Sequence, residues 1–173
     1  MAKTVLLIDA CVREESSRTL KLAQRYLDTL EDVQVNHQAL YELNLAPLSR
    51  AETMERKRLD LAQAFAQADE IVVAAPYWDL SFPAVLKLYL EHICVSGITF
   101  HYVGAQAEGL CRAKKAVYVS SCGGFVGGHH LGEEYVKTLF QTMFGIPEFH
   151  AIRCEGLDLP DANPDQLVAK AAL

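Results

Sequence analysis

Five short apolar runs alternate with segments of helical periodicity, and this alternation limits the possible folds more than any other feature of the chain. The runs have the length of buried strands, and the segments between them place apolar residues three or four positions apart. The predicted strands are Val5–Asp9, Val33–Leu40, Glu70–Ala75, Lys115–Ser121 and Glu148–Cys154. The predicted helices are Ser16–Glu31, Arg56–Ala68, Phe82–Ser96, Leu131–Phe144 and a short last helix from Pro164. Such an alternation is typical of an α/β fold, a parallel sheet with helices on both faces.

The handedness of strand–helix–strand connections leaves few arrangements for this sheet. For five strands the order 2-1-3-4-5 is the natural one, and the alternating polarity of Val33–Leu40 predicts an edge strand. We find no repeat, low-complexity segment or internal linker, so we expect a single domain over residues 1–173. In sheets of this order, ligands bind beyond the carboxyl ends of the strands, beside the first strand.

Composition excludes several classes of function. The net charge is −6 and no Lys/Arg-rich run is present, which argues against a protein that binds nucleic acid through its phosphates. No apolar run approaches the roughly 18 residues of a membrane span. The start, Met1–Thr4, leads directly into the first strand without the regions of a signal peptide, so we expect a cytoplasmic protein.

The five cysteines give no sign of a metal site. Their number is odd and no two have CxxC spacing. The one histidine pair, His129-His130, consists of adjacent residues, which do not share a face of a regular element. We therefore predict reduced, mostly structural cysteines and no metal.

The loop after the first strand, DACVREESSRTL over residues 9–20, has the features of a phosphate site. Ser16 or Ser17 is a good N-cap, and the free N–H groups and dipole of a helix start attract phosphate. Arg13 and Arg18 add positive charge. The plainer interpretation is that the serines cap the helix and the arginines are solvated. Within the same loop lie Glu14 and Glu15, carboxylates that compete with a phosphate if they point inward and are harmless if they face solvent.

Two further loops complete the predicted ligand edge. The third strand stops at Pro76, and Tyr77, Trp78, Asp79 and Phe82 follow. Isolated aromatics usually pack beneath a loop, but their position at this edge favours a wall for a flat ring. After the fourth strand, SSCGGFVGGHH supplies Ser121 and two glycines, Gly123 and Gly124, whose missing Cβ atoms permit close approach. An anion site, an aromatic wall and a backbone-lined slot together fit a flat heterocycle with a phosphate, such as flavin mononucleotide (FMN).

A phosphatase is a rival interpretation of the first loop. Cys11 and Arg18 have C-x6-R-T spacing, whereas low-mass tyrosine phosphatases have C-x5-R-[ST]. The extra residue misaligns the phosphate cradle, and the two glutamates raise the pKa of a cysteine that must be a thiolate. The Asp-Pro general acid of those enzymes is also missing, since no Asp-Pro pair occurs in the sequence. A receiver domain is disfavoured too, because the third strand lacks a terminal aspartate.

The chain resembles the flavodoxin-like NAD(P)H-dependent oxidoreductases, which include FMN-dependent azoreductases and NAD(P)H:quinone reductases. The resemblance rests on an ordered set of segments, APYWDLSFPAVLKLYLEH, GITFHYVGAQAEGL, KKAVYVSSCGG and EGLDL, and covers about residues 3 to 160. It implies a flavodoxin-like three-layer sandwich that binds FMN noncovalently. It also implies hydride transfer from NAD(P)H through the flavin to a quinone, azo compound or similar acceptor, by a ping-pong mechanism.

The resemblance also assigns roles to residues. Arg13, Ser16 and Ser17 match the phosphate segment, Pro76 to Asp79 (Pro76, Tyr77, Trp78 and Asp79) match the loop along the isoalloxazine ring, and Ser121, Gly123 and Gly124 match the segment at its other edge. Tyr102 matches an aromatic residue that approaches the flavin of the partner subunit in related dimers. The sequence departs from the family in three ways: Glu15 stands where a serine is expected, the connection Tyr41–Glu55 is short, and the tail after Asp158 is brief.

We expect a homodimer for a second reason. The third predicted helix is apolar nearly all round, and a sheet covers only one of its faces. A second copy related by a two-fold axis covers the rest, although the fourth helix is an alternative cover within one chain. Two other functions remain open from the sequence: a non-enzymatic flavodoxin-like electron carrier, and a relative without cofactor that acts as a binding module.

Overall fold

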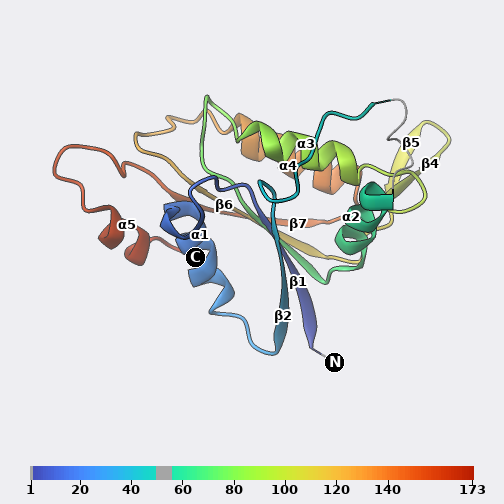
Figure 1. Ribbon diagram of the computed structural model, residues 1–173, viewed down its shortest axis with the longest axis horizontal. Coiled ribbons are helices and arrows are strands. Elements are labelled where there is room, and N and C mark those ends of the chain that lie inside the picture. Colours follow the sequence, from blue (N-terminus) through green and yellow to red (C-terminus); the bar gives the residue numbers. More distant parts are fainter. Residues whose placement is uncertain (1, 50–55) are drawn as a thin grey trace.

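A five-stranded parallel sheet forms the centre of the molecule in a computed structural model that describes residues 2–49 and 56–173 (Figure 1). Its strands are β1 (Lys3–Asp9), β2 (Val33–Ala39), β3 (Glu70–Ala74), β6 (Lys115–Ser121) and β7 (Glu148–Cys154). They lie in the order β2-β1-β3-β6-β7. This is the order 2-1-3-4-5 that the sequence predicts, and β2 is the expected edge strand.

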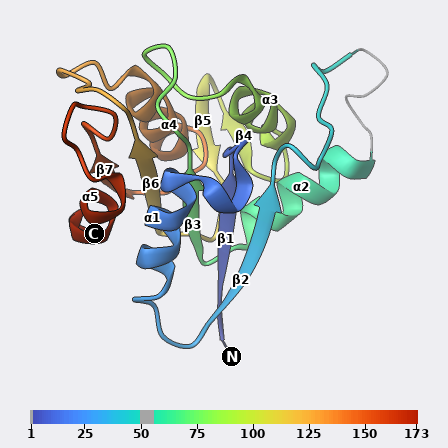
Figure 2. The same cartoon turned by 60° about the vertical axis from the view of Figure 1, so that its left-hand side comes forward.

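Helices cover both faces of the sheet and make three layers. They are α1 (Arg18–Leu27), α2 (Arg56–Gln67), α3 (Ala84–Ile93), α4 (Leu131–Thr142) and α5 (Pro164–Lys170). α2, α3 and α4 lie on one face, and α1 and α5 lie on the other (Figures 1 and 2). The first helix starts two residues later than predicted because a 3-10 turn, η1 (Glu14–Ser16), precedes it.

Two apolar clusters hold the layers together. On the face of α2 to α4, the rings of Phe65, Phe140 and Phe144 meet with centroids 4.9 to 5.6 Å apart. On the other face, Leu22 and Ala23 of α1 pack against the sheet. Every residue of β3 is buried, because helices cover this central strand on both sides. The ligand edge is therefore the end of a rigid sheet.

A β-hairpin between α3 and β6 was not predicted. Its strands are β4 (Phe100–Val103) and β5 (Gln106–Gly109), which pair antiparallel. Gly109 lies so close to the end of α4 that an added Cβ would stand 2.0 Å from the carbonyl carbon of Phe144. This contact fixes the base of the hairpin, while Tyr102 and Val103 on β4 are exposed.

Part of the connection Tyr41–Glu55 and Met1 lie outside the described residues. Among the helices of residues 2–49 and 56–173, none has the length and apolar character needed to cross a bilayer.

Candidate functional site

A cavity of about 270 Å³ opens at the carboxyl ends of β1, β3 and β6, where the sheet order predicts a ligand. We call it the candidate cavity. The predicted residues that line it are Arg13, Ser16, Ser17, Pro76, Tyr77, Trp78, Ser121 and Gly123. Three predicted residues do not line it: Asp79, Gly124 and Tyr102. The cavity thus brings together eight side chains or glycines from three separate loops.

One end of the candidate cavity is built for an anion. Ser17 is the N-cap of α1, since its Oγ accepts a hydrogen bond of 3.2 Å from the backbone N–H of Leu20. The N–H groups of Arg18 and Thr19 occupy the first two helical positions, which have no intrahelical acceptor. The side chains of Arg13 and Arg18 line the same end. Backbone donors and the helix dipole therefore favour an anion there, with Arg13 among the lining residues and Arg18 paired with Asp158.

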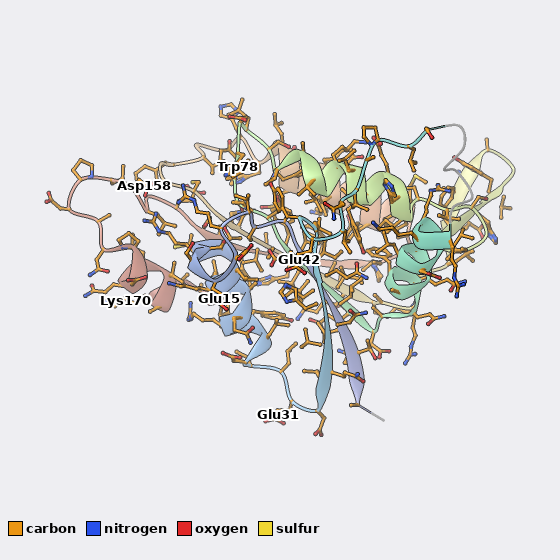
Figure 3. All side chains as sticks on the ribbon, viewed as in Figure 1. Glu15, Glu31, Glu42, Trp78, Asp158 and Lys170 are labelled. Atoms are coloured by element: carbon orange, nitrogen blue, oxygen red, sulfur yellow. The ribbon has the colours of Figure 1, made fainter. Side chains whose placement is uncertain are left out.

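The two glutamates of this loop do not line the candidate cavity. Glu14 and Glu15 line a neighbouring hollow of about 240 Å³, together with Asp9, His37 and Glu42. We call it the acidic hollow. Figure 3 shows Trp78 and Asp158 near the upper edge of the molecule and Glu15 lower, beside α1. Glu14 and Glu15 therefore do not line the cavity where an anion would bind, and Asp158 is the one carboxylate among the described residues that does.

The loop after β3 forms an aromatic wall with a tight turn at its tip. Tyr77 and Trp78 line the candidate cavity, and 41% of Trp78 is exposed. Trp78 and Ser81 exchange two backbone hydrogen bonds of 3.1 and 2.7 Å. Between them, Asp79 and Leu80 have φ values of 51° and 67°, as both central residues of a type I′ turn do. Asp79 is therefore a turn residue at the tip of the loop and does not line the cavity. The left-handed backbone of Leu80 costs a residue with a Cβ about 1–2 kcal/mol of conformational free energy.

The glycine loop after β6 has a tighter fit than the sequence suggested. A Cβ on Gly123 would lie 2.3 Å from Oδ2 of Asp158, so a larger residue here would displace the Asp158 side chain. Nothing lies within 4 Å of the corresponding point on Gly124. Asp158 is itself paired with Arg18, its Oδ1 2.6 Å from Nη1. The ion pair joins α1 to the loop after β7 at the rim of the candidate cavity.

Backbone hydrogen bonds continue beyond the strand ends and tie the loops together. The N–H of Tyr77 donates to the carbonyl of Ser121 at 3.0 Å, and that of Asp158 donates to the carbonyl of Gly123 at 2.9 Å. The loop after β7 therefore forms part of the site through Leu157 and Asp158, which sequence reasoning did not place there. The rule that placed the other loops applies to it equally, because β7 ends at the same edge of the sheet. Thr19 also lines the candidate cavity and was not predicted as a site residue.

The cysteines near the site are poor nucleophiles. Cys11 is buried and its Sγ donates to the carbonyl of Ala74 at 3.6 Å. Burial, followed by the charge of Asp9, raises the pKa of its thiol far above the ordinary value. Burial also raises the pKa of Cys122, at the floor of the candidate cavity. Neither residue supplies the thiolate that a phosphatase needs. No group of three or more His, Cys, Asp or Glu suited to a metal occurs in residues 2–49 and 56–173.

Tyr102 stands apart from the candidate cavity within one chain. It lies on β4, and 63% of its surface is exposed. Its ring contacts that of Phe100 edge to face, with centroids 5.5 Å apart. In Figure 1 the hairpin is at the right-hand end of the molecule and α1 and α5 are on the left.

A sheet of this order, with a helix start suited to an anion and an aromatic wall at its ligand edge, is typical of the class of flavodoxin-like proteins. Residues 3–173 match the family model described as the flavodoxin-like fold, and the chain belongs to this family. It is 37% identical, over 90% of its length and 87% of the relative's, to FMN-dependent NADH:quinone oxidoreductase 2 of Clostridium acetobutylicum. It is 34% identical, over 95% of its length and 91% of the relative's, to an FMN-dependent NADH:quinone oxidoreductase of Clostridium perfringens.

Solved structures show the same fold. An azoreductase from Bacillus anthracis superposes with a TM-score of 0.81 at 21% identity, over 96% of this chain and 93% of that one. An FMN-dependent NADH-azoreductase of the same species, solved in complex with FMN, gives a TM-score of 0.77 at 17% identity, over 98% and 93% of the two chains.

Proposed function

We propose that the protein is an FMN-dependent oxidoreductase that passes hydride from NAD(P)H through the flavin to a quinone, an azo compound or a similar acceptor. The observation that carries this proposal is the candidate cavity, which joins an anion site to an aromatic wall. The names of the Clostridium relatives support the same reaction.

The residues of the candidate cavity fit FMN. The free N–H groups of Arg18 and Thr19, with Arg13 beside them, suit a terminal phosphate. Tyr77 and Trp78 suit a flat aromatic ring. When bound, FMN supplies the chemistry of accepting and donating hydride, for which no protein nucleophile is needed.

The protein itself would then bind the flavin, orient it and shield it from solvent. Ser17 and the first turn of α1 would hold the phosphate end of FMN, and Tyr77 and Trp78 would support its ring. The dipole of α1 and the guanidinium of Arg18 favour negative charge in the candidate cavity. Ser121 and Gly123 line the cavity on the side of the glycine loop. We expect the nicotinamide and the acceptor to use the same site in turn, which would give ping-pong turnover.

The absorbance spectrum of purified protein tests this function. We expect FMN to be retained or taken up, and its absorbance to bleach rapidly when NADH or NADPH is added without oxygen and to return when a quinone follows. Uptake of FMN without bleaching by either nucleotide would identify an electron carrier. A colourless protein that takes up no FMN would identify a binding module. Parallel double-reciprocal lines are expected for ping-pong turnover, and intersecting lines contradict it.

We also propose that the reaction takes place in the cytoplasm and that the working unit is a homodimer. All five cysteines are free, as expected of a reducing compartment. Tyr102 and Val103 are exposed apolar side chains on a hairpin anchored at Gly109. Such a surface suits a second copy of the chain, in which Tyr102 approaches the neighbour's flavin.

Tyr102→Ala tests the dimer and the role of Tyr102 together. We expect it to change the kcat and KM for the acceptor more than the Kd for FMN, because the residue does not line its own cavity. Sedimentation of the FMN-loaded wild type at micromolar concentration as a 19.2 kDa species contradicts the dimer.

A further inference from the structure

Two buried hydroxyl groups connect the anion end of the candidate cavity to its glycine loop. Oγ1 of Thr19 lies 2.7 Å from Oγ of Ser121, and 102 positions separate the two residues in the sequence. Thr19 is 1% exposed and Ser121 is 9% exposed. Thr19 belongs to the first turn of α1, and Ser121 is the last residue of β6. The contact therefore fixes a helix to a strand end inside the wall of the site.

Ser121 is held by its backbone as well. Its carbonyl accepts the N–H of Tyr77 at 3.0 Å. The side chain of Ser121 thus contacts α1, and its main chain contacts the aromatic wall. Ser121 therefore links Thr19 to the aromatic wall through two contacts.

The chemistry of a hydroxyl pair gives Thr19 a definite task. In such a pair one group donates and the other accepts, and the accepting hydroxyl keeps its own hydrogen for another partner. When Thr19 donates, the hydrogen of Ser121 is free to point into the candidate cavity. A fixed hydroxyl also costs less conformational entropy on binding than a free one.

We infer that Thr19 is a positioning residue for the ring of the bound flavin and that Thr19 acts through Ser121. Thr19 has this role although it lies in the helical turn that attracts the phosphate. This inference rests on the proposed function. Thr19 contributes two separate groups: its backbone N–H faces the anion end, and its side chain orients the residue that faces the ring. Removing the side-chain hydroxyl affects the second contribution and leaves the first.

A comparison of FMN with riboflavin, which lacks the phosphate, separates the two contributions. Thr19→Val keeps the shape of the side chain and removes the hydroxyl. We expect the Kd values for FMN and riboflavin, measured by quenching of flavin fluorescence, to rise by the same factor, about fivefold. Thr19→Ser restores both values. Thr29→Val is the matched control, because the hydroxyl of Thr29 bonds to the carbonyl of Tyr26 at the other end of α1; it leaves both unchanged.

The double variant Thr19→Val/Ser121→Ala gives an independent readout. If Thr19 acts through Ser121, the double variant binds both flavins no more weakly than Ser121→Ala alone. Urea unfolding of the flavin-free proteins measures any general loss of stability separately. Such a general loss would not make the effects of Thr19→Val and Ser121→Ala on flavin binding non-additive.

Three outcomes overturn the inference. A loss confined to FMN places the role of the side chain at the phosphate. Unchanged Kd values for both flavins remove any role. Additive losses in the double variant show that Thr19 does not act through Ser121. If the wild type binds neither flavin, the proposed function fails and the inference fails with it, whereas the first three outcomes leave the proposed function intact.

Discussion

The loop after β1 separates two hollows of opposite charge. The candidate cavity receives Arg13 and Arg18, with Asp158 paired to Arg18 at its rim. The acidic hollow receives the carboxylates of Asp9, Glu14, Glu15 and Glu42, with one histidine, His37, 3.0 Å from Asp9. Both hollows share the buried Cys11. The six residues from Arg13 to Arg18 thus contribute positively charged side chains to one hollow and negatively charged side chains to its neighbour.

The local backbone geometry decides which of the two hollows each charged side chain of this loop lines. η1 turns the chain at Glu14, whose φ of 49° is in the left-handed region. The side chains of Glu14 and Glu15 then line one hollow, while those of Arg13, Ser16 and Ser17 line the other. The direction of these side chains, which the net charge of −6 does not report, therefore decides which of the two hollows suits an anion.

The largest effect is expected from a negative charge inside the candidate cavity. Ser17→Asp keeps a good N-cap but adds a carboxylate beside the proposed phosphate. At about 4 Å, two unit charges repel by about 4 kcal/mol in a partly buried setting, so we expect the Kd for FMN to rise at least 100-fold. The Kd for riboflavin should change by less than about threefold. Titration of both flavins by fluorescence measures the difference.

Tyr41→Asp is the matched control, because it adds the same charge to the acidic hollow. We expect it to change the Kd for FMN by less than about threefold. Equal losses in the two variants would show that the two hollows are not electrostatically separate.

The next largest effect is expected from removing a positive charge. Arg13→Gln deletes a guanidinium that lines the candidate cavity but keeps a long polar side chain. A charge-assisted hydrogen bond contributes about 1.5–3 kcal/mol, and exposure of Arg13 reduces this, so a roughly tenfold rise in the Kd for FMN is expected. The loss should shrink as salt is added. A loss of the same size for riboflavin would contradict a role at the phosphate.

The sheet order and the ligand edge could be predicted from the sequence because both follow from periodicity and chain topology. The apolar run ending at Pro76 and the N-cap at Ser17 are local signals, and local signals decide strands and helix starts. The hairpin of β4 and β5 carries a local signal that was overlooked: Gly104, with a φ of 63°, begins the two-residue turn between Val103 and Gln106. Where the hairpin packs is not a local matter, because Gly109 lies against the backbone of Phe144 and Gly145, which are distant in the sequence.

The site was predictable to the extent that it depends on backbone position. Tyr77, Trp78 and Ser121 follow directly from the strands that end beside them. Side-chain pairing was not predictable: Thr19 with Ser121 and Arg18 with Asp158 join residues 102 and 140 positions apart. The side on which Glu14 and Glu15 lie depends on a single left-handed residue, which no apolar pattern encodes.

A smaller effect, in the opposite direction, is expected at the rim. Asp158→Asn preserves shape against Gly123 but removes the charge that pairs with Arg18. Because the pair is largely exposed, it contributes only about 0–1 kcal/mol, and we expect the Kd for FMN to fall by about threefold. Asp165→Asn is the control, since Asp165 is 4.0 Å from Lys21 of α1, outside the candidate cavity. Weaker binding of FMN by Asp158→Asn would show that Arg18 needs Asp158 to hold its place.

The smallest effect is expected from the acidic hollow itself. Glu15→Gln removes an exposed carboxylate that is close to the phosphate site in sequence but lines the other hollow. At an ionic strength of 0.15 M, charges on opposite sides of an exposed loop are screened over about 8 Å, so the Kd for FMN should fall by less than about twofold. The direction is fixed, because any remaining field of Glu15 repels an anion, and the effect should vanish in 0.5 M salt. A tenfold gain in FMN affinity at 0.15 M would mean that Glu15 enters the candidate cavity in solution, and the separation of the two hollows would then be wrong.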